Sequence, residues 1–111
     1  MTEQKKVVVR WDAAVLRAEP EEMKVNSRAE SVRWELESSR RGARITRIVF
    51  AGDPAGPFTK VAKVEGSSDR SWQGDGSKNQ PLGQRYKYSV FVADSSGEVE
   101  LDPYIIDTDK P

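Results

Sequence analysis

The sequence predicts an all-β fold, a single Greek-key β-sandwich, and three features of the chain support this prediction. First, helical periodicity is hard to find: in and just after residues 20–33 the apolar residues fall in pairs two positions apart (Met23 with Val25, Val32 with Trp34), as they do in strands. Second, short runs of alternating apolar and polar residues recur along the chain. Third, clusters of Gly, Pro, Asn, Asp and Ser separate these runs, as is typical of sandwiches.

The clearest strand pattern lies in residues 85–93, where Tyr or Val occupies every second position. Residues 30–36 alternate as regularly. We expect Trp34 and Tyr88, from these two segments, to pack in the core on facing or adjacent strands. The predicted strands cover residues 6–11, 14–17, 23–26, 30–36, 43–50, 60–64, 85–93, 99–101 and 104–106.

Two further expectations concern the direction of side chains. In residues 43–50, simple alternation predicts Ile48 and Phe50 on one face of the strand and Ile45 on the other. Trp11 lies at the end of the first predicted strand, and we expect it to be half-buried.

The connections between strands differ in length and composition. Residues 94–97 combine Asp, Ser and Gly, which predicts a tight hairpin turn with Gly97 at positive φ. Residues 51–57 contain two prolines and form one long connection. Residues 66–83, rich in Gly, Ser and Asp, predict a second long loop, and such loops are often functional or mobile.

Length and charge indicate one domain without an affinity for nucleic acid or membranes. We expect residues 1–111 to form a single sandwich, with residues 1–5 and 108–111 as flexible tails. The 18 basic and 18 acidic residues balance, whereas nucleic-acid binders carry a basic excess. The first apolar run is too short for a signal peptide, and no run approaches a membrane span. The sequence therefore predicts a cytoplasmic protein.

The chain contains no cysteine and no histidine. Catalysis by serine–histidine or cysteine–histidine pairs is therefore excluded. Since His and Cys are the main ligands of transition metals, we expect no specific metal and no cofactor. A pair of carboxylates is the remaining catalytic arrangement that this composition permits.

Short motifs near both ends of the chain resemble cupredoxin-like β-sandwiches. Residues 16–20, 23–25 and 32–34 are similar to the opening of that family, in which a strand ends at proline and a Val-x-Trp strand crosses the core. Residues 86–90 resemble the family's aromatic-x-aromatic-x-Cys strand, with Val90 at the position of the copper-binding cysteine. The resemblance therefore implies a metal-free relative. Immunoglobulin-like sandwiches give similar patterns and remain an alternative.

Trp72 is the one aromatic residue of the predicted loop at residues 66–83. Tryptophan is enriched in binding hot spots, and charged neighbours can orient a ligand. We therefore take Trp72, Arg70, Asp75 and Asp69 as a candidate site for a ligand or partner. The alternative is that Trp72 folds back and plugs one end of the sandwich.

A group of arginines surrounds a predicted turn and strand: Arg40, Arg41, Arg44 and Arg47. They are candidates for a patch that binds an anion or an acidic partner. The alternative is a solvated face whose arginines pair with Glu35 and Glu37 of the neighbouring strand.

These features favour a non-enzymatic binding module that acts through protein–protein contact. Exposed loops or an edge strand would supply the contact, either with a protein partner or with a second copy of the chain. The alternative is a sandwich that binds a small ligand or carbohydrate through the Trp72 loop. A carboxylate-dependent hydrolase is the third hypothesis.

Overall fold

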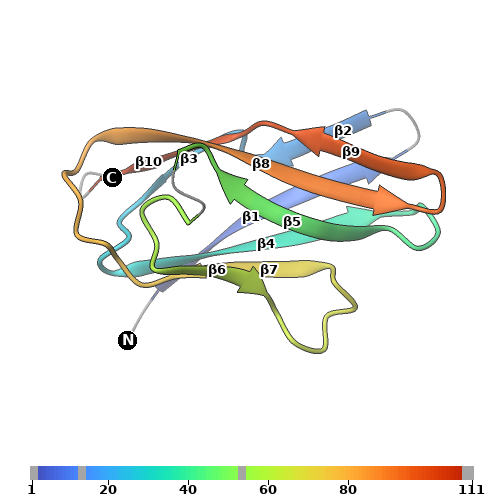
Figure 1. Cartoon of the computed structure of the whole chain (residues 1–111), viewed down its shortest axis with the longest axis horizontal. Helices are drawn as coiled ribbons and strands as arrows, with labels where there is room; N and C mark the ends of the chain where they lie inside the picture. The colour runs from blue at the N-terminus through green and yellow to red at the C-terminus, as the bar shows by residue number, and fades with distance from the viewer. Residues whose placement is uncertain (1–2, 13–14, 53–54, 109–111) are drawn as a thin grey trace.

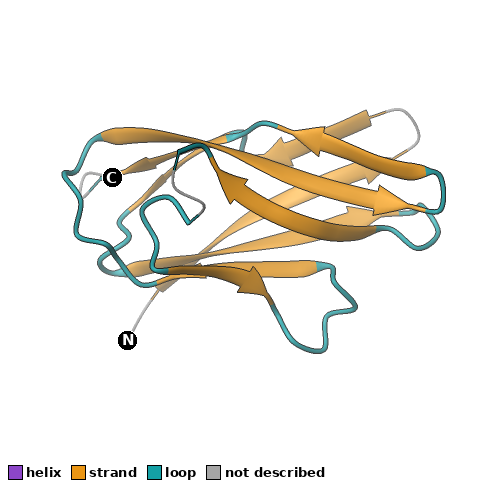
Figure 2. Cartoon of the chain, viewed as in Figure 1, coloured by secondary structure: helices purple, strands orange, loops and turns teal. Residues whose placement is uncertain are grey.

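Ten strands make up the computed structural model, which describes residues 3–12, 15–52 and 55–108. These residues form no helix, and hence none long and apolar enough to cross a membrane (Figure 2). The strands are β1 (Glu3–Asp12), β2 (Val15–Glu19), β3 (Glu22–Val25), β4 (Glu30–Ser38), β5 (Arg44–Phe50), β6 (Lys60–Lys63), β7 (Ser71–Asp75), β8 (Gln84–Asp94), β9 (Gly97–Leu101) and β10 (Tyr104–Asp107).

The strands form two sheets that pack face to face, so the predicted all-β sandwich is confirmed (Figure 1). The first sheet has the order β2-β1-β4-β7-β6. The second has the order β3-β10-β8-β5, and β9 also pairs with β8. Each sheet contains one parallel pair, β1 with β4 and β3 with β10. The other pairs are antiparallel.

The chain crosses from the first sheet to the second at Pro20. Before it, β2 pairs with β1, and after it, β3 pairs with β10. Both β10 and β9 lie on the side of β8 that faces away from β5, β10 along residues 84–87 and β9 along residues 90–94. If the residues before Pro20 stayed in the second sheet, in line with β3, they would lie beside β9. Because β2 is in the other sheet, β9 pairs with β8 alone.

The core is built around Trp34 on β4 and Tyr88 on β8, and the prediction that both residues pack in the core is confirmed. Their exposed fractions are 0% and 1%. The indole Nε1–H of Trp34 donates to the Tyr88 hydroxyl at 3.0 Å, and the rings meet edge to face at 5.6 Å. Phe50 stacks on Tyr88 at 4.9 Å. Burial raises the pKa of the Tyr88 phenol, so the hydroxyl stays neutral in the core.

Ile45 faces the core, and the prediction that it faces away is wrong. The register of β5 against β8 shifts between Ile45 and Arg47, as in a β-bulge. A bulge inserts one residue into a strand and reverses the alternation beyond it. Ile45, Ile48 and Phe50 are therefore all buried.

The predicted loop at residues 66–83 contains a strand, β7, which the sequence reading missed. β7 lies between β4 and β6, so Trp72 belongs to a sheet and pairs with Trp34. A side chain at Gly74 would place its Cβ 2.9 Å from the Phe58 ring. The glycine that suggests a loop in the sequence is thus required by packing in a strand.

The ends of the described chain are paired. β1 begins at Glu3 and pairs with β4 from that residue, so residues 3–5, expected in a flexible tail, belong to the first sheet. Thr108 donates its N–H to the Val25 carbonyl at 2.8 Å. Residues 1–2 and 109–111 of the predicted tails lie outside the described residues.

Candidate functional site

One long edge of the sandwich is closed by hydrogen bonds between the sheets. The N–H of Ile45, on β5, donates to the Asp69 carbonyl at 2.7 Å. The indole N–H of Trp72, on β7, donates to the Ile45 carbonyl at 3.4 Å. These bonds join the edge of the second sheet to the first and leave no free strand edge at Ile45.

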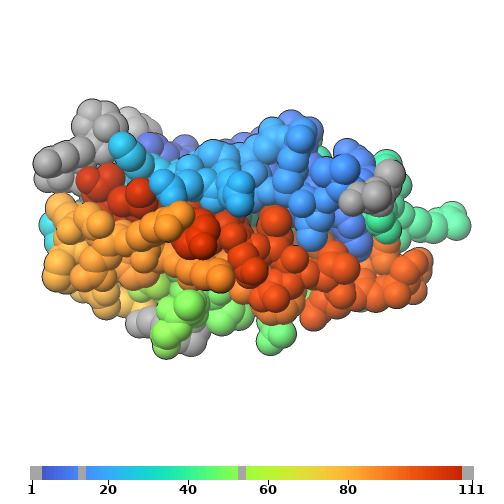
Figure 3. Space-filling view, turned by 90° about the horizontal axis from the view of Figure 1, so that it is seen from above, coloured from blue at the N-terminus to red at the C-terminus, as the bar shows by residue number. Residues whose placement is uncertain are grey.

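The opposite edge is open. There β2 of the first sheet and β9 of the second run side by side, as both views show (Figures 1 and 3). Among the described residues no backbone hydrogen bond joins these two strands. A cavity of about 330 Å³ opens between the sheets, and its lining residues are Trp11, Leu16, Arg40, Asp94, Ser96, Gly97, Glu98 and Val99.

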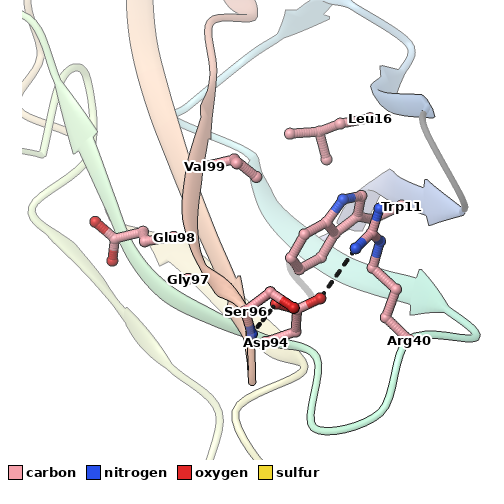
Figure 4. Close-up of a pocket in the computed structure, with 8 residues that line it drawn as sticks. All are labelled: Trp11, Leu16, Arg40, Asp94, Ser96, Gly97, Glu98 and Val99. Carbon is pink, nitrogen blue, oxygen red and sulfur yellow. Dashed lines mark hydrogen bonds and ion pairs between the residues drawn. The ribbon is translucent and has the colours of Figure 1, made fainter.

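A stacked ion pair forms the floor of this cavity (Figure 4). Trp11 is the last residue but one of β1 and is 5% exposed, so it is more buried than the sequence predicts. The guanidinium of Arg40 lies 4.5 Å from the centre of the indole ring and pairs with Asp94 at 3.0 Å. The Ser96 N–H donates to Asp94 at 2.8 Å. The Ser96 N–H, together with Arg40, holds the pKa of the Asp94 carboxyl below its ordinary value.

The apolar wall of the cavity is made by Leu16 on β2 and Val99 on β9 (Figure 4). Val99 pairs with Val92 and shares the inner face of the sheet with it. Val92 is fully buried, whereas Val99 is 43% exposed. The inner face of β9 therefore lacks the cover that the opposite sheet provides elsewhere.

The outer face of β9 is acidic. Glu98 and Glu100 both lie exposed there, and Figure 4 shows Glu98 pointing away from the cavity. The Thr46 hydroxyl donates to Glu98 at 2.7 Å. Within the described part of the chain, neither glutamate forms an ion pair.

The edge of β9 presents free backbone groups. Asp94 pairs with Gly97, whose φ is +140°, so the predicted hairpin turn is confirmed. Hydrogen-bonded and non-bonded pairs alternate along an antiparallel ladder. Every second residue of β9 thus turns its N–H and C=O away from β8. These groups face the side of β9 on which no described strand pairs with it.

Trp72 and Asp69 of the predicted ligand site do lie together. They line a smaller hollow, about 200 Å³, at the closed edge of the sandwich. Their polar groups already have partners: Trp72 donates to the Ile45 carbonyl, and Asp69 lies 3.5 Å from the Lys63 ammonium. These residues thus serve to join the two sheets at the closed edge.

The other two residues of that predicted site lie elsewhere. Asp75 ends β7 and accepts hydrogen bonds from Gln73 at 2.9 and 3.0 Å. Arg70 donates to the Ser38 carbonyl at 3.5 Å. Neither lines the hollow at Trp72.

The four predicted arginines do not share one patch. Arg40 belongs to the open edge, and Arg44 lines the hollow at Trp72. Arg47 lies on the outer face of the second sheet, 4.0 Å from the centre of the Phe91 ring. Arg41 is exposed in the turn between β4 and β5.

The expected pairing of these arginines with the β4 glutamates is also wrong. Glu35 lies 3.4 Å from both Lys6 and Arg33, and Glu37 lies 2.6 Å from Arg10. Lys6 and Arg10 lie on β1, the parallel neighbour of β4, and Arg33 lies on β4 itself, so these carboxylates pair with cations of the first sheet.

A third hollow, about 400 Å³, lies on the outer face of the second sheet around Phe91. Its floor is β5 and β8, and β8 has a hydrogen-bonded neighbour on each side there. This surface offers side chains alone, whereas the open edge offers side chains and a strand edge.

The open edge provides apolar contact and hydrogen bonding. No group of three Asp or Glu side chains within the described residues is placed to hold a metal ion. Asp94 is ion-paired, and its lowered pKa keeps it ionised at neutral pH, which does not suit a proton donor.

Sequence reasoning named Arg40 but missed the other residues of this edge, among them Trp11, Leu16, Asp94 and Val99. One signal was available. The strand after the hairpin turn reads Glu-Val-Glu, and charged residues on a short strand are typical of an edge.

The chain matches no known protein family and no curated protein.

Proposed function

We propose that this protein is a non-enzymatic binding module that takes up an extended peptide segment of a protein partner at the edge of β9. Such a segment would add a strand to the second sheet, hydrogen bond to β9 and place alternate side chains in the cavity. The carrying observation is that an unpaired strand edge and an open apolar cavity coincide at Val99.

The size and the position of the cavity favour a peptide over a compact small molecule. Its volume of about 330 Å³ is at the low end for small-molecule sites. Its lining includes Leu16 of β2 and residues 97–99 of β9, so a segment that pairs with β9 would lie directly beside it. Side chains placed every second residue on one face of a strand match this geometry.

The strand order and pairing also bear on the kind of sandwich. The parallel pairs β1–β4 and β3–β10, and the crossing between sheets at Pro20, support a metal-free cupredoxin-like arrangement. Immunoglobulin-like sandwiches are built from antiparallel sheets. A cytoplasmic location and the absence of a cofactor stay predictions of the sequence.

A display library of random ten-residue peptides, selected on the purified domain, tests the function. The amide resonances of residues 97–101 and the indole resonance of Trp11 should shift when an enriched peptide is added to ¹⁵N-labelled protein. Val99→Ser should weaken binding about tenfold or more, since a buried valine contributes about 1.5–3 kcal/mol. Val15→Ser is the matched control, because Val15 is also exposed (54%) but faces away from the cavity.

Two results would contradict the proposal. The first is a selection that enriches no peptide above the background of an unrelated domain. The second is a set of shifts centred on Trp72 and Asp69, which would favour the small-ligand alternative.

A further inference from the structure

The two exposed faces of β9 differ in chemistry, and each would contact alternate side chains of an added strand. The inner face presents Val99 toward Leu16 and the edge of the Trp11 ring. The outer face presents Glu98 and Glu100. An added strand therefore meets apolar groups on one side and carboxylates on the other.

Charges elsewhere around this edge are already compensated. On β2, Arg17 lies 2.7 Å from Glu19, which lies 3.0 Å from Arg10. Arg10 in turn pairs with Glu37 at 2.6 Å. The carboxylates of β9 have no such partners within the described residues, so they are the uncompensated charges of the open edge.

Two cations lie farther in on the same outer face. Arg47 is on β5 and is held over the Phe91 ring at 4.0 Å. Lys87 is on β8, beyond the residues that pair with β9. Both line the hollow that Glu100 also lines, but no ion pair joins them to it within the described residues. Neither is on the edge strand, so a strand added beside β9 would contact the glutamates first.

We propose that the segment bound at β9 alternates apolar and basic side chains, with its apolar residues in the cavity and its Lys or Arg residues opposite Glu98 and Glu100. This inference rests on the proposed peptide-binding function. It names the partner's chemistry and distinguishes a partner protein from a second copy of this chain.

Pairing of β9 with itself is disfavoured by the same charges. In a two-fold antiparallel pair centred on Val99, Glu98 of one copy lies opposite Glu100 of the other. A pair centred on Glu100 brings the two Glu100 side chains together. Like charges directly opposite one another destabilise a ladder. A basic segment removes this repulsion and adds favourable pairs in its place.

Two capped six-residue peptides, one repeating Lys-Val and one repeating Glu-Val, test the inference by titration into ¹⁵N-labelled protein. The Lys-Val peptide should shift the resonances of residues 97–101 and bind at least tenfold more tightly. Its affinity should fall as salt is raised, because exposed charges are screened. Glu98→Lys/Glu100→Lys should reverse the preference.

Two single variants control for changes in folding and net charge. Glu100→Lys leaves the hydrogen bond from Thr46 to Glu98 intact and should reduce the preference for the Lys-Val peptide. Glu65→Lys makes the same charge change at an exposed residue between β6 and β7 and should leave the preference unchanged.

The outcomes separate this inference from the function on which it rests. Equal binding of both peptides at β9 would overturn the charge preference and leave peptide binding intact. Binding of a library peptide at β9 without binding of the Lys-Val peptide would also overturn the preference. If no peptide of either kind binds, the proposed function fails as well. A concentration-dependent dimer in sedimentation, with shifts at β9, would favour self-pairing instead.

Discussion

Removing the Tyr88 hydroxyl tests whether the hydrogen bond in the core stabilises the fold. Tyr88→Phe keeps the ring that stacks on Phe50 at 4.9 Å and meets Trp34 at 5.6 Å. It removes only the acceptor of the Trp34 indole N–H, at 3.0 Å. Because Trp34 is 0% exposed, water cannot replace that acceptor. An unsatisfied buried donor costs about 1–3 kcal/mol, so we expect the free energy of unfolding to fall by that amount.

A double-mutant cycle isolates the interaction. Trp34→Phe removes the donor and also leaves a cavity, so it should cost more than Tyr88→Phe, and Trp34→Ala should cost about 3–5 kcal/mol. In the double variant, Trp34→Phe with Tyr88→Phe, both polar atoms are gone. The two single losses should therefore exceed the double loss by about 1 kcal/mol or more.

Urea unfolding followed by far-ultraviolet circular dichroism measures these free energies. Thermal unfolding is a second measurement, in which a loss of 1 kcal/mol lowers the melting temperature by roughly 4–6 °C in a domain near 100 residues. Tyr104→Phe is the control, because its ring is only partly buried and stacks under Arg85. A Tyr88→Phe midpoint equal to that of the parent, or an additive cycle, would refute the reasoning.

Three other predictions follow from the site and its edges. Asp94 has a lowered pKa when folded, so its contribution to stability is present above the ordinary carboxyl pKa of about 4 and is lost as pH falls through the lower folded value. In urea titrations at a series of acidic pH values, Asp94→Asn should lose less stability than the parent as pH falls. Parallel curves of unfolding free energy against pH for the two proteins would contradict the ion pair between Arg40 and Asp94. Gly97→Ala should cost about 1–3 kcal/mol in the same assay because φ is +140° there, and an unchanged midpoint would mean that the hairpin adopts another turn. Trp72→Ala should cost about 1.5–3 kcal/mol while an enriched peptide keeps its affinity for β9, and the reverse pattern would return Trp72 to the binding site.

Strand alternation made much of the core predictable. Trp34, Tyr88 and the valines of β8 occupy every second position, and a period of two places them on one face whatever the partner strand is. The hairpin at residues 94–97 was predictable for a similar reason. Its turn residues are adjacent in sequence, and Gly97 alone permits the required φ.

Two errors came from interactions between segments distant in the chain. The bulge in β5 depends on how that strand pairs with β8, and no residue type in β5 predicts it. β7 has few apolar residues of its own, and its pairing with both β4 and β6 makes it a strand. Local propensity is a weak guide where neighbouring strands supply the hydrogen bonds and the cover.

The candidate site was the least predictable part of the molecule. Trp11, Leu16, Arg40, Asp94 and Val99 come from three separate regions of the chain, residues 11–16, 40 and 94–99. They meet because β2 pairs in the first sheet and the chain crosses to the second sheet only at Pro20. The sequence by itself determined the all-β class, the alternating core strands and the absence of histidine and cysteine chemistry, since these follow from composition and local period. The tertiary structure alone decided that β9 has no second neighbour and that apolar residues beside it stay uncovered, because both depend on the position of one sheet against the other.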